Sequence, residues 1–151
     1  MPDFMQRRKW ARVLDRSAQR MADVVTPEKG WIAAMRYALG MSADQVAARK
    51  GVSRNAVYQA ERSEQEGSVS LKQMERLATA MGGTFVYAII PNEPIAALKY
   101  KQAILNARHM ANETPNFNAL TADEQQDWLD DTAAQQLHDM PPDFWELHAA
   151  D

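Results

Sequence analysis

Residues 53–62, SRNAVYQAER, carry side chains whose types and spacing suit the reading of DNA bases. Val57 and Ala60 are three positions apart, so in a helix they share one face and would point into a core. The other face would carry four polar side chains, Arg54, Asn55, Tyr58 and Gln59. Arginine can pair with O6 and N7 of guanine, and asparagine or glutamine with N6 and N7 of adenine. The segment therefore predicts a helix that reads base edges in the major groove.

Four nearby residues are predicted to contact phosphates, which sets the register of a protein on DNA without reading its sequence. Ser53 would cap the base-reading helix, and the positive N-terminus of a helix suits a phosphate. The predicted phosphate-positioning residues are Ser53, Gln45, Arg49 and Arg62.

Two short helices joined by a glycine turn would position these side chains. Ser42-Ala43-Asp44-Gln45 is a capping box that begins a helix through Lys50, and Gly51 suits the left-handed backbone of a tight turn. The small side chain of Ala47 would let the helices approach closely, with an interface filled by Val46, Val52 and Val57. This is the layout of a helix-turn-helix. The alternative is a plain helical hairpin with a solvated polar face.

Capping signals and hydrophobic spacing predict the other elements. We expect a basic amphipathic helix at 4–22, a helix from Thr26-Pro27 to Gly40, and helices at 70–82, 94–111 and 121–138. Thr84–Ile90, TFVYAII, reads as the one β-strand because it is β-branched and aromatic and lies between glycines and Pro91.

The expected fold class is mainly α: a phage-repressor-like helix-turn-helix domain with one β-strand and a C-terminal helical extension. The expected parts are a basic N-terminal helix (1–25), the helix-turn-helix domain with its terminal strand (26–91), and an acidic helical extension (92–151).

The single predicted strand needs a neighbour, because its backbone groups would otherwise stay unpaired. Residues 23–26, the same strand of a second copy, or the edge of a partner protein could supply it. Helix-turn-helix proteins usually dimerise to place two recognition helices on a palindrome. We therefore expect a homodimer, with the contact residues Phe85, Val86, Tyr87 and Ile89.

Charge divides the chain into two parts. Residues 1–62 hold 12 Lys or Arg against 6 Asp or Glu, whereas residues 63–151 hold 5 against 14. Such asymmetry is typical of a nucleic-acid face at one end. The acidic end would face away from DNA, because negative charges oppose binding to phosphates. It also carries three apolar side chains that we expect to dock a protein partner: Phe144, Trp145 and Leu147.

Composition and spacing argue against several function classes. The chain has no cysteine, which removes disulfides and cysteine-based metal or catalytic sites. His109, His138 and His148 lack the spacing of metal ligands, and we find no nucleophile motif or glycine-rich phosphate loop. We therefore expect no enzyme, cofactor or metal site. No apolar run approaches the roughly 20 residues of a membrane span, so a cytoplasmic protein without a membrane partner is expected.

Gly30 to Pro91 resembles the mobile mystery protein A family of Xre-type helix-turn-helix regulators. The likeness includes the Gly-Trp-Ile start, the Ala-Leu-Gly-Met run, the segment Glu61–Gly67, the Leu-Lys helix, and the Val-Tyr-Ala segment that ends in proline. A weaker likeness extends to the arginine-rich leader and to an acidic C-terminal segment that closes on Trp145.

The resemblance implies a regulator that is encoded beside a Fic-domain protein and acts as the antitoxin of that pair. Such a protein would bind the Fic-domain toxin and repress its own operon by binding operator DNA in its own promoter. Some Fic inhibitors place three residues between a Ser or Thr and an inhibitory glutamate, whereas only two separate Ser63 from Glu66 here. We therefore expect neutralisation through another surface. The alternatives are a stand-alone Xre-type repressor and a protein-interaction module without DNA binding.

Overall fold

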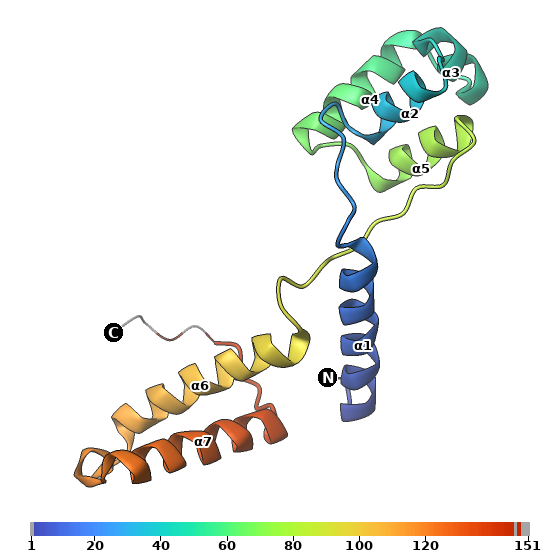
Figure 1. The fold of residues 1–151 in the computed structure, drawn as a ribbon. Coiled ribbons are helices and arrows are strands. Elements are labelled where there is room, and N and C mark those ends of the chain that lie inside the picture. Colours follow the sequence, from blue (N-terminus) through green and yellow to red (C-terminus); the bar gives the residue numbers. More distant parts are fainter. Residues whose placement is uncertain (1, 147, 149–151) are drawn as a thin grey trace. The chain divides into compact units, whose positions relative to one another are not determined.

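The computed structural model describes residues 2–146 and 148 of the chain. They form two compact units, a central unit of residues 21–89 and a terminal unit that combines the described parts of 1–20 and 90–151. Residues 2–20 thus group with the C-terminal helices, whereas the sequence predicted a separate N-terminal part at 1–25. All regular elements of the described residues are helices (Figure 1). None of these helices has the length and hydrophobicity needed to cross a membrane.

The central unit packs four helices around one core. These are α2 (Trp31–Ala38), α3 (Ala43–Lys50), α4 (Arg54–Glu66) and α5 (Leu71–Ala80). Val46, Val57 and Leu77 are completely buried, so α3, α4 and α5 each contribute a side chain to the centre. Ala47 is 3% exposed in the same core, where its small side chain allows close helix packing as the sequence predicted. Val52 is 38% exposed, so the prediction that it fills this interface is wrong.

Helix starts that depend on local capping are confirmed. Ser42 begins α3 with a complete capping box, and Ser53 and Ser70 accept hydrogen bonds from the backbone three residues on. The expected start at Thr26-Pro27 is wrong, because α2 begins at Trp31.

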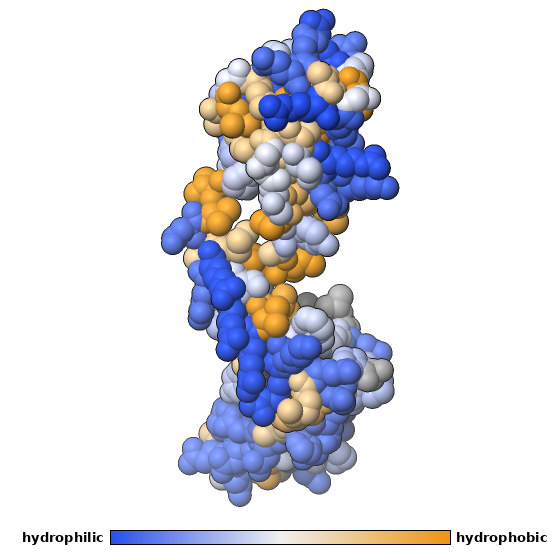
Figure 2. Space-filling model, turned by 90° about the vertical axis from the view of Figure 1, so that its right-hand side faces the viewer, coloured by the Kyte–Doolittle hydropathy of each residue, from blue (hydrophilic) through white to orange (hydrophobic). Residues whose placement is uncertain are grey.

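The predicted strand at Thr84–Ile90 is also wrong. In the described residues this segment has no regular secondary structure, and in Figure 1 it runs as a drawn-out connection after α5. Residues 23–26 form no strand either, so nothing in the described chain completes a β-ladder, and a strand cannot exist without a paired neighbour. The segment leaves hydrophobic side chains in solvent, with Val86, Tyr87 and Ile89 being 72%, 69% and 83% exposed. Exposed hydrophobic surface of this kind is orange in Figure 2.

The terminal unit contains α1 (Phe4–Met21), α6 (Ile95–Glu113), the short 3₁₀ helix η1 (Phe117–Ala119) and α7 (Ala122–Asp139). Helices α6 and α7 form an antiparallel pair (Figure 1). Their interface is built from alanines, which allow close approach, and from the ring of Phe144. The Asp15 carboxylate of α1 accepts a hydrogen bond from the Ile95 backbone (3.0 Å), which satisfies a free N–H at the start of α6.

A buried amide holds the segment after α7 against this pair. Asn106 is 4% exposed, and its Nδ2 donates to the carbonyl oxygen of Phe144 (2.9 Å) and to Oε1 of Gln136 (3.2 Å). Phe144 is 1% exposed, so the prediction that it docks a partner is wrong for the folded chain. Trp145 is 55% exposed and stays available, whereas Leu147 lies outside the described residues.

Candidate nucleic-acid interface

Helix α4 is held rigidly at both ends. At its start, Ser53 Oγ accepts a hydrogen bond from the Ala56 backbone (3.2 Å), and before it Gly51 turns the chain with a left-handed φ of 74°. At its end Gly67 has a φ of 76°, and its N–H bonds back to Glu64 and Ser63. The side chains of α4 are therefore presented from a helix that is capped at both ends.

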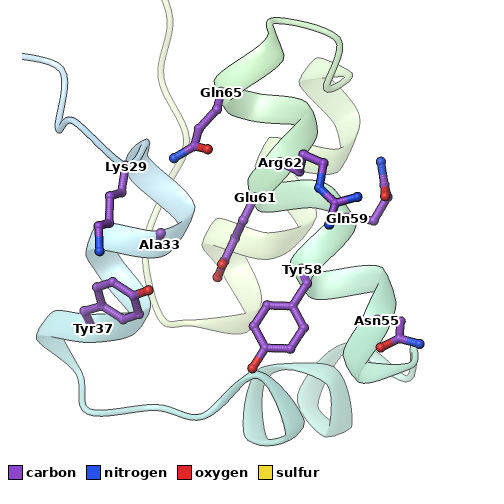
Figure 3. A pocket seen from close by; sticks show the side chains of 9 residues that line it. All are labelled: Lys29, Ala33, Tyr37, Asn55, Tyr58, Gln59, Glu61, Arg62 and Gln65. Atoms are coloured by element: carbon purple, nitrogen blue, oxygen red, sulfur yellow. The ribbon is translucent and has the colours of Figure 1, made fainter.

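The residues predicted to read bases lie together on the solvent side of α4. Val57 and Ala60 are 0% and 4% exposed and anchor the helix in the core. The opposite side carries four exposed residues, Arg54, Asn55, Tyr58 and Gln59. Figure 3 shows three of them, Asn55, Tyr58 and Gln59, along one length of α4. This arrangement gives donors and acceptors an unobstructed path to base edges.

Arg54 has an acidic neighbour that competes for its guanidinium. Its Nη1 lies 3.8 Å from Oδ2 of Asp44 on α3, and the two side chains are 59% and 69% exposed. An exposed pair of this kind contributes only about 0–1 kcal/mol. Arg54 can therefore leave Asp44 for a guanine at little cost.

Two of the predicted phosphate-positioning residues also serve the fold. Gln45 Oε1 accepts a hydrogen bond from the Ser42 backbone, so only its Nε2 remains for a phosphate. Ser53 accepts from Ala56, which leaves its hydroxyl hydrogen free to donate. Both residues thus cap a helix and keep one donor.

The other two predicted phosphate-positioning residues lie apart. Arg49 Nη1 is 3.5 Å from the carbonyl oxygen of Ala80 at the end of α5, so the structure does not bring it to the face of α4. Arg62 is exposed one turn beyond Tyr58 on α4. Only Arg62 is therefore continuous with the predicted base-reading residues.

A buried ion pair fastens α4 to α2. Arg36 of α2 donates from Nε to Oε1 of Glu61 (2.6 Å) and from Nη2 to Oε2 (3.1 Å), and the side chains are 8% and 12% exposed. The hydrogen bond to Glu61 raises the pKa of the Arg36 guanidinium, against the opposing effect of burial. Arg36 also lies near the rings of Tyr37 and Tyr58, 4.6 and 5.7 Å from their centroids.

The pair between Arg36 and Glu61 was not among the predicted contacts, although the sequence contains a signal for it. Arg36 lies four residues after the buried Ile32, and Glu61 lies four after the buried Val57. Opposite charges on the apolar faces of two neighbouring helices indicate a buried pair.

A second missed residue, Glu64, caps α2 from a distance. Its Oε1 accepts a hydrogen bond from the Trp31 backbone (2.6 Å), and its Oε2 accepts one from the Ile32 backbone (3.0 Å). The carboxylate also complements the positive N-terminus of α2. No local pattern indicates this contact, because α2 lacks a capping side chain of its own.

The described residues contain no group of three or more His, Asp or Glu side chains placed to hold a metal ion. The exposed polar face of α4 is thus the best-formed candidate site of the central unit.

The family comparison agrees with this geometry. A family model described as helix-turn-helix matches residues 32–87, from the start of α2 to the segment after α5. Residues 32–87 are a helix-turn-helix domain of the Xre type. No curated protein and no solved structure matches the chain. Within the helix-turn-helix domain, α3 and α4 are the pair joined by Gly51, so α4 takes the place of the recognition helix. A domain of this type binds DNA in gene regulation.

Proposed function

We propose that the chain is a sequence-specific transcriptional regulator whose recognition helix is α4. The observation that carries this proposal is the exposed set Arg54, Asn55 and Gln59 on a capped helix, within the part of the chain that matches the helix-turn-helix family. These three side chain types can make bidentate contacts to guanine or adenine, each worth about 1–3 kcal/mol of discrimination.

The test is binding of the purified chain to its own upstream DNA and to scrambled DNA of equal length, by fluorescence anisotropy across salt concentrations. We expect the wild type to prefer the upstream DNA, and Arg54→Ala with Asn55→Ala to abolish that preference. Arg76→Ala, which removes an exposed charge from α5, is the control and should keep it. If the double variant retains the preference, α4 does not read the sequence.

The more specific role that we propose is autorepression of the operon and neutralisation of a Fic-domain toxin. The resemblance of Gly30–Pro91 to mobile mystery protein A supports this role. We propose that the toxin contacts the acidic side of α7 and the exposed Trp145, which lie in the terminal unit and leave α4 free for operator DNA.

Co-expression with the protein encoded beside this chain, which we expect to carry a Fic domain, tests that role. Trp145→Ala should weaken the complex, whereas Trp10→Ala removes a tryptophan of equal 55% exposure from α1 and should not. If the chain regulates its upstream DNA but binds no such protein, the stand-alone repressor is the better description.

We also propose that the chain binds DNA as a homodimer that associates through Phe85, Val86, Tyr87 and Ile89. The support is the hydrophobic surface that Val86, Tyr87 and Ile89 expose after α5, next to the half-buried Phe85. Light scattering after size exclusion should give a dimer mass for the wild type and a monomer mass for Val86→Lys with Ile89→Lys. A monomeric wild type at binding concentrations would contradict the dimer.

A further inference from the structure

The side of α4 that faces α2 contains a cavity of about 580 Å³. Figure 3 shows Lys29 and Tyr37 on the α2 side of this cavity, and Tyr58 and Arg62 on α4. Asn55, Tyr58 and Gln59 of the predicted base-reading set also line the cavity, so it adjoins that face directly. Lys29 precedes the segment matched by the helix-turn-helix family.

The charges around the cavity favour an anion. Glu61 is the one acidic residue among the described residues that line it, and its carboxylate is already held by Arg36. Lys29 and Arg62 form no ion pair with any described residue. The ammonium group of Lys29 lies 5.5 Å from the centroid of the Tyr37 ring, which keeps it beside the cavity. The cavity thus keeps two positive charges that the fold does not neutralise.

The dimensions of DNA place a phosphate strand along this side of α4. The major groove is about 12 Å wide, and a helix with its side chains is about 10–12 Å across. A recognition helix therefore fills the groove, and a sugar-phosphate strand passes along each of its sides. The free donors Gln45 Nε2 and the Ser53 hydroxyl lie at the N-terminal ends of α3 and α4. The cavity with Lys29, Tyr37 and Arg62 lies where α4 faces α2.

We propose that this cavity receives a phosphodiester group of the bound DNA. Lys29 and Arg62 neutralise the phosphate, and the Tyr37 hydroxyl donates a hydrogen bond to one of its oxygens. Tyr37 is 54% exposed, so its hydroxyl is accessible to DNA. The inference rests on the proposed DNA binding by α4, and it adds Lys29 and Tyr37 as contacts from outside the α3–α4 pair.

Lys29→Ala tests the proposal, with the dissociation constant measured against salt for upstream and scrambled DNA. One lost phosphate contact should weaken binding about eightfold at 0.1 M salt, equally for both DNAs. The slope of log K against log salt should become shallower by about 1. Lys29→Arg should restore most of the affinity because it keeps the charge, and Tyr37→Phe should weaken binding while leaving the slope unchanged.

Arg76→Ala controls for the loss of one positive charge elsewhere in the central unit and should keep the wild-type slope. Lys29 is exposed, so Lys29→Ala should leave the unfolding curve unchanged. The same unfolding measurement checks that the other variants are folded. If Lys29→Ala has wild-type affinity and slope while Arg54→Ala with Asn55→Ala loses the preference, the cavity inference fails and the proposed function stands. If the wild type binds no DNA, both fail.

Discussion

The Glu64 carboxylate of α4 leaves no room for a side chain on Gly30. A β-carbon at Gly30 would lie 2.8 Å from Cδ and from Oε2 of Glu64, and Gly30 has a φ of 85° and a ψ of 166°. That backbone conformation is accessible almost only to glycine. Glycine at this position therefore lets the chain turn into α2 and lets Glu64 reach the first N–H groups of the helix.

Gly30→Ala should destabilise the central unit more than Gly40→Ala does. Gly40 has a φ of 65° with no atom within 4 Å of a β-carbon, so alanine there meets backbone strain alone. At Gly30 we expect a strain of about 1–3 kcal/mol together with the clash against Glu64. Urea denaturation measures the free energy of unfolding of the two variants. Equal losses for Gly30→Ala and Gly40→Ala would show that the Glu64 side chain moves aside freely.

Glu64→Ala should lower the free energy of unfolding by about 0.5–2 kcal/mol, because two N–H groups of α2 lose their acceptor. Glu66→Ala is the control, since Glu66 is exposed two residues further along α4 and makes no such contact among the described residues. Urea curves of the two variants should separate. In the Glu64→Ala background, Gly30→Ala should lower the free energy of unfolding by less than it does in the wild type, because the clashing carboxylate is gone. If the losses of the two single variants simply add in the double variant, there is no clash.

Breaking the pair between Arg36 and Glu61 should be costly. Glu61→Gln leaves the buried guanidinium without its counter-ion, and we expect a loss of about 3–5 kcal/mol of stability. Glu93→Gln breaks the exposed pair with Lys101 and should cost no more than about 1 kcal/mol. Arg36→Met with Glu61→Leu should be more stable than Glu61→Gln in thermal and urea unfolding. A single variant as stable as the wild type would mean that solvent replaces the lost partner.

Asp44→Asn should strengthen DNA binding. It releases Arg54 from its 3.8 Å contact and removes a negative charge beside the proposed interface. The gain should be about 0–1 kcal/mol for upstream DNA, which Arg54 is proposed to read, and smaller for scrambled DNA, which gains only from the lost negative charge. Glu75→Gln removes an exposed charge from α5 and serves as the control in the same anisotropy measurement. Weaker binding by Asp44→Asn would mean that Asp44 orients Arg54 instead of competing for it.

The start of α7 should depend on pH through Glu124. Hydrogen bonds from the backbone and the hydroxyl of Thr121 lower the pKa of Glu124 from its ordinary value of 4.5. Because the folded-state pKa is the lower one, this stabilisation is complete above about pH 4.5 and is lost as the pH falls through the folded value. Carboxyl-detected NMR titration should show Thr121→Val moving the pKa upward, with Thr132→Val as the unaffected control. An unchanged pKa in Thr121→Val would exclude a contribution from the Thr121 hydroxyl, because the variant keeps the backbone hydrogen bond to Glu124.

Much of the local structure could be predicted because its signals act within one turn. Ser42, Ser53 and Thr121 each bond to a backbone N–H three residues further on, so their spacing alone indicated a helix start. The turn at Gly51 followed in the same way from a residue type that tolerates a positive φ. Helical spacing around the buried Val57 also indicated which side chains of α4 face solvent.

The predictions failed where the deciding contact lies far away in sequence. Helix α2 was expected to begin at Thr26-Pro27, but it begins at Trp31. The backbone N–H of Trp31 is capped by the carboxylate of Glu64, 33 positions later in the sequence. Strand propensity at Thr84–Ile90 did not produce a strand, because β-structure needs a paired neighbour. Phe144 was predicted to dock a partner, but it is buried because Asn106, 38 positions earlier on α6, donates a hydrogen bond to its carbonyl oxygen.

The sequence by itself determined the serine and threonine caps of α3, α4, α5 and α7, and the polar side of α4 that is proposed to meet DNA, because these depend on spacing within a few residues. Only the tertiary structure decided which polar groups are paired within the fold and which are left for a ligand. Contacts between α2 and α4 pair Arg36, Glu61 and Glu64. Lys29 and Arg62 remain without a counter-ion among the described residues. Burial and pairing depend on distance in space, which no local pattern encodes.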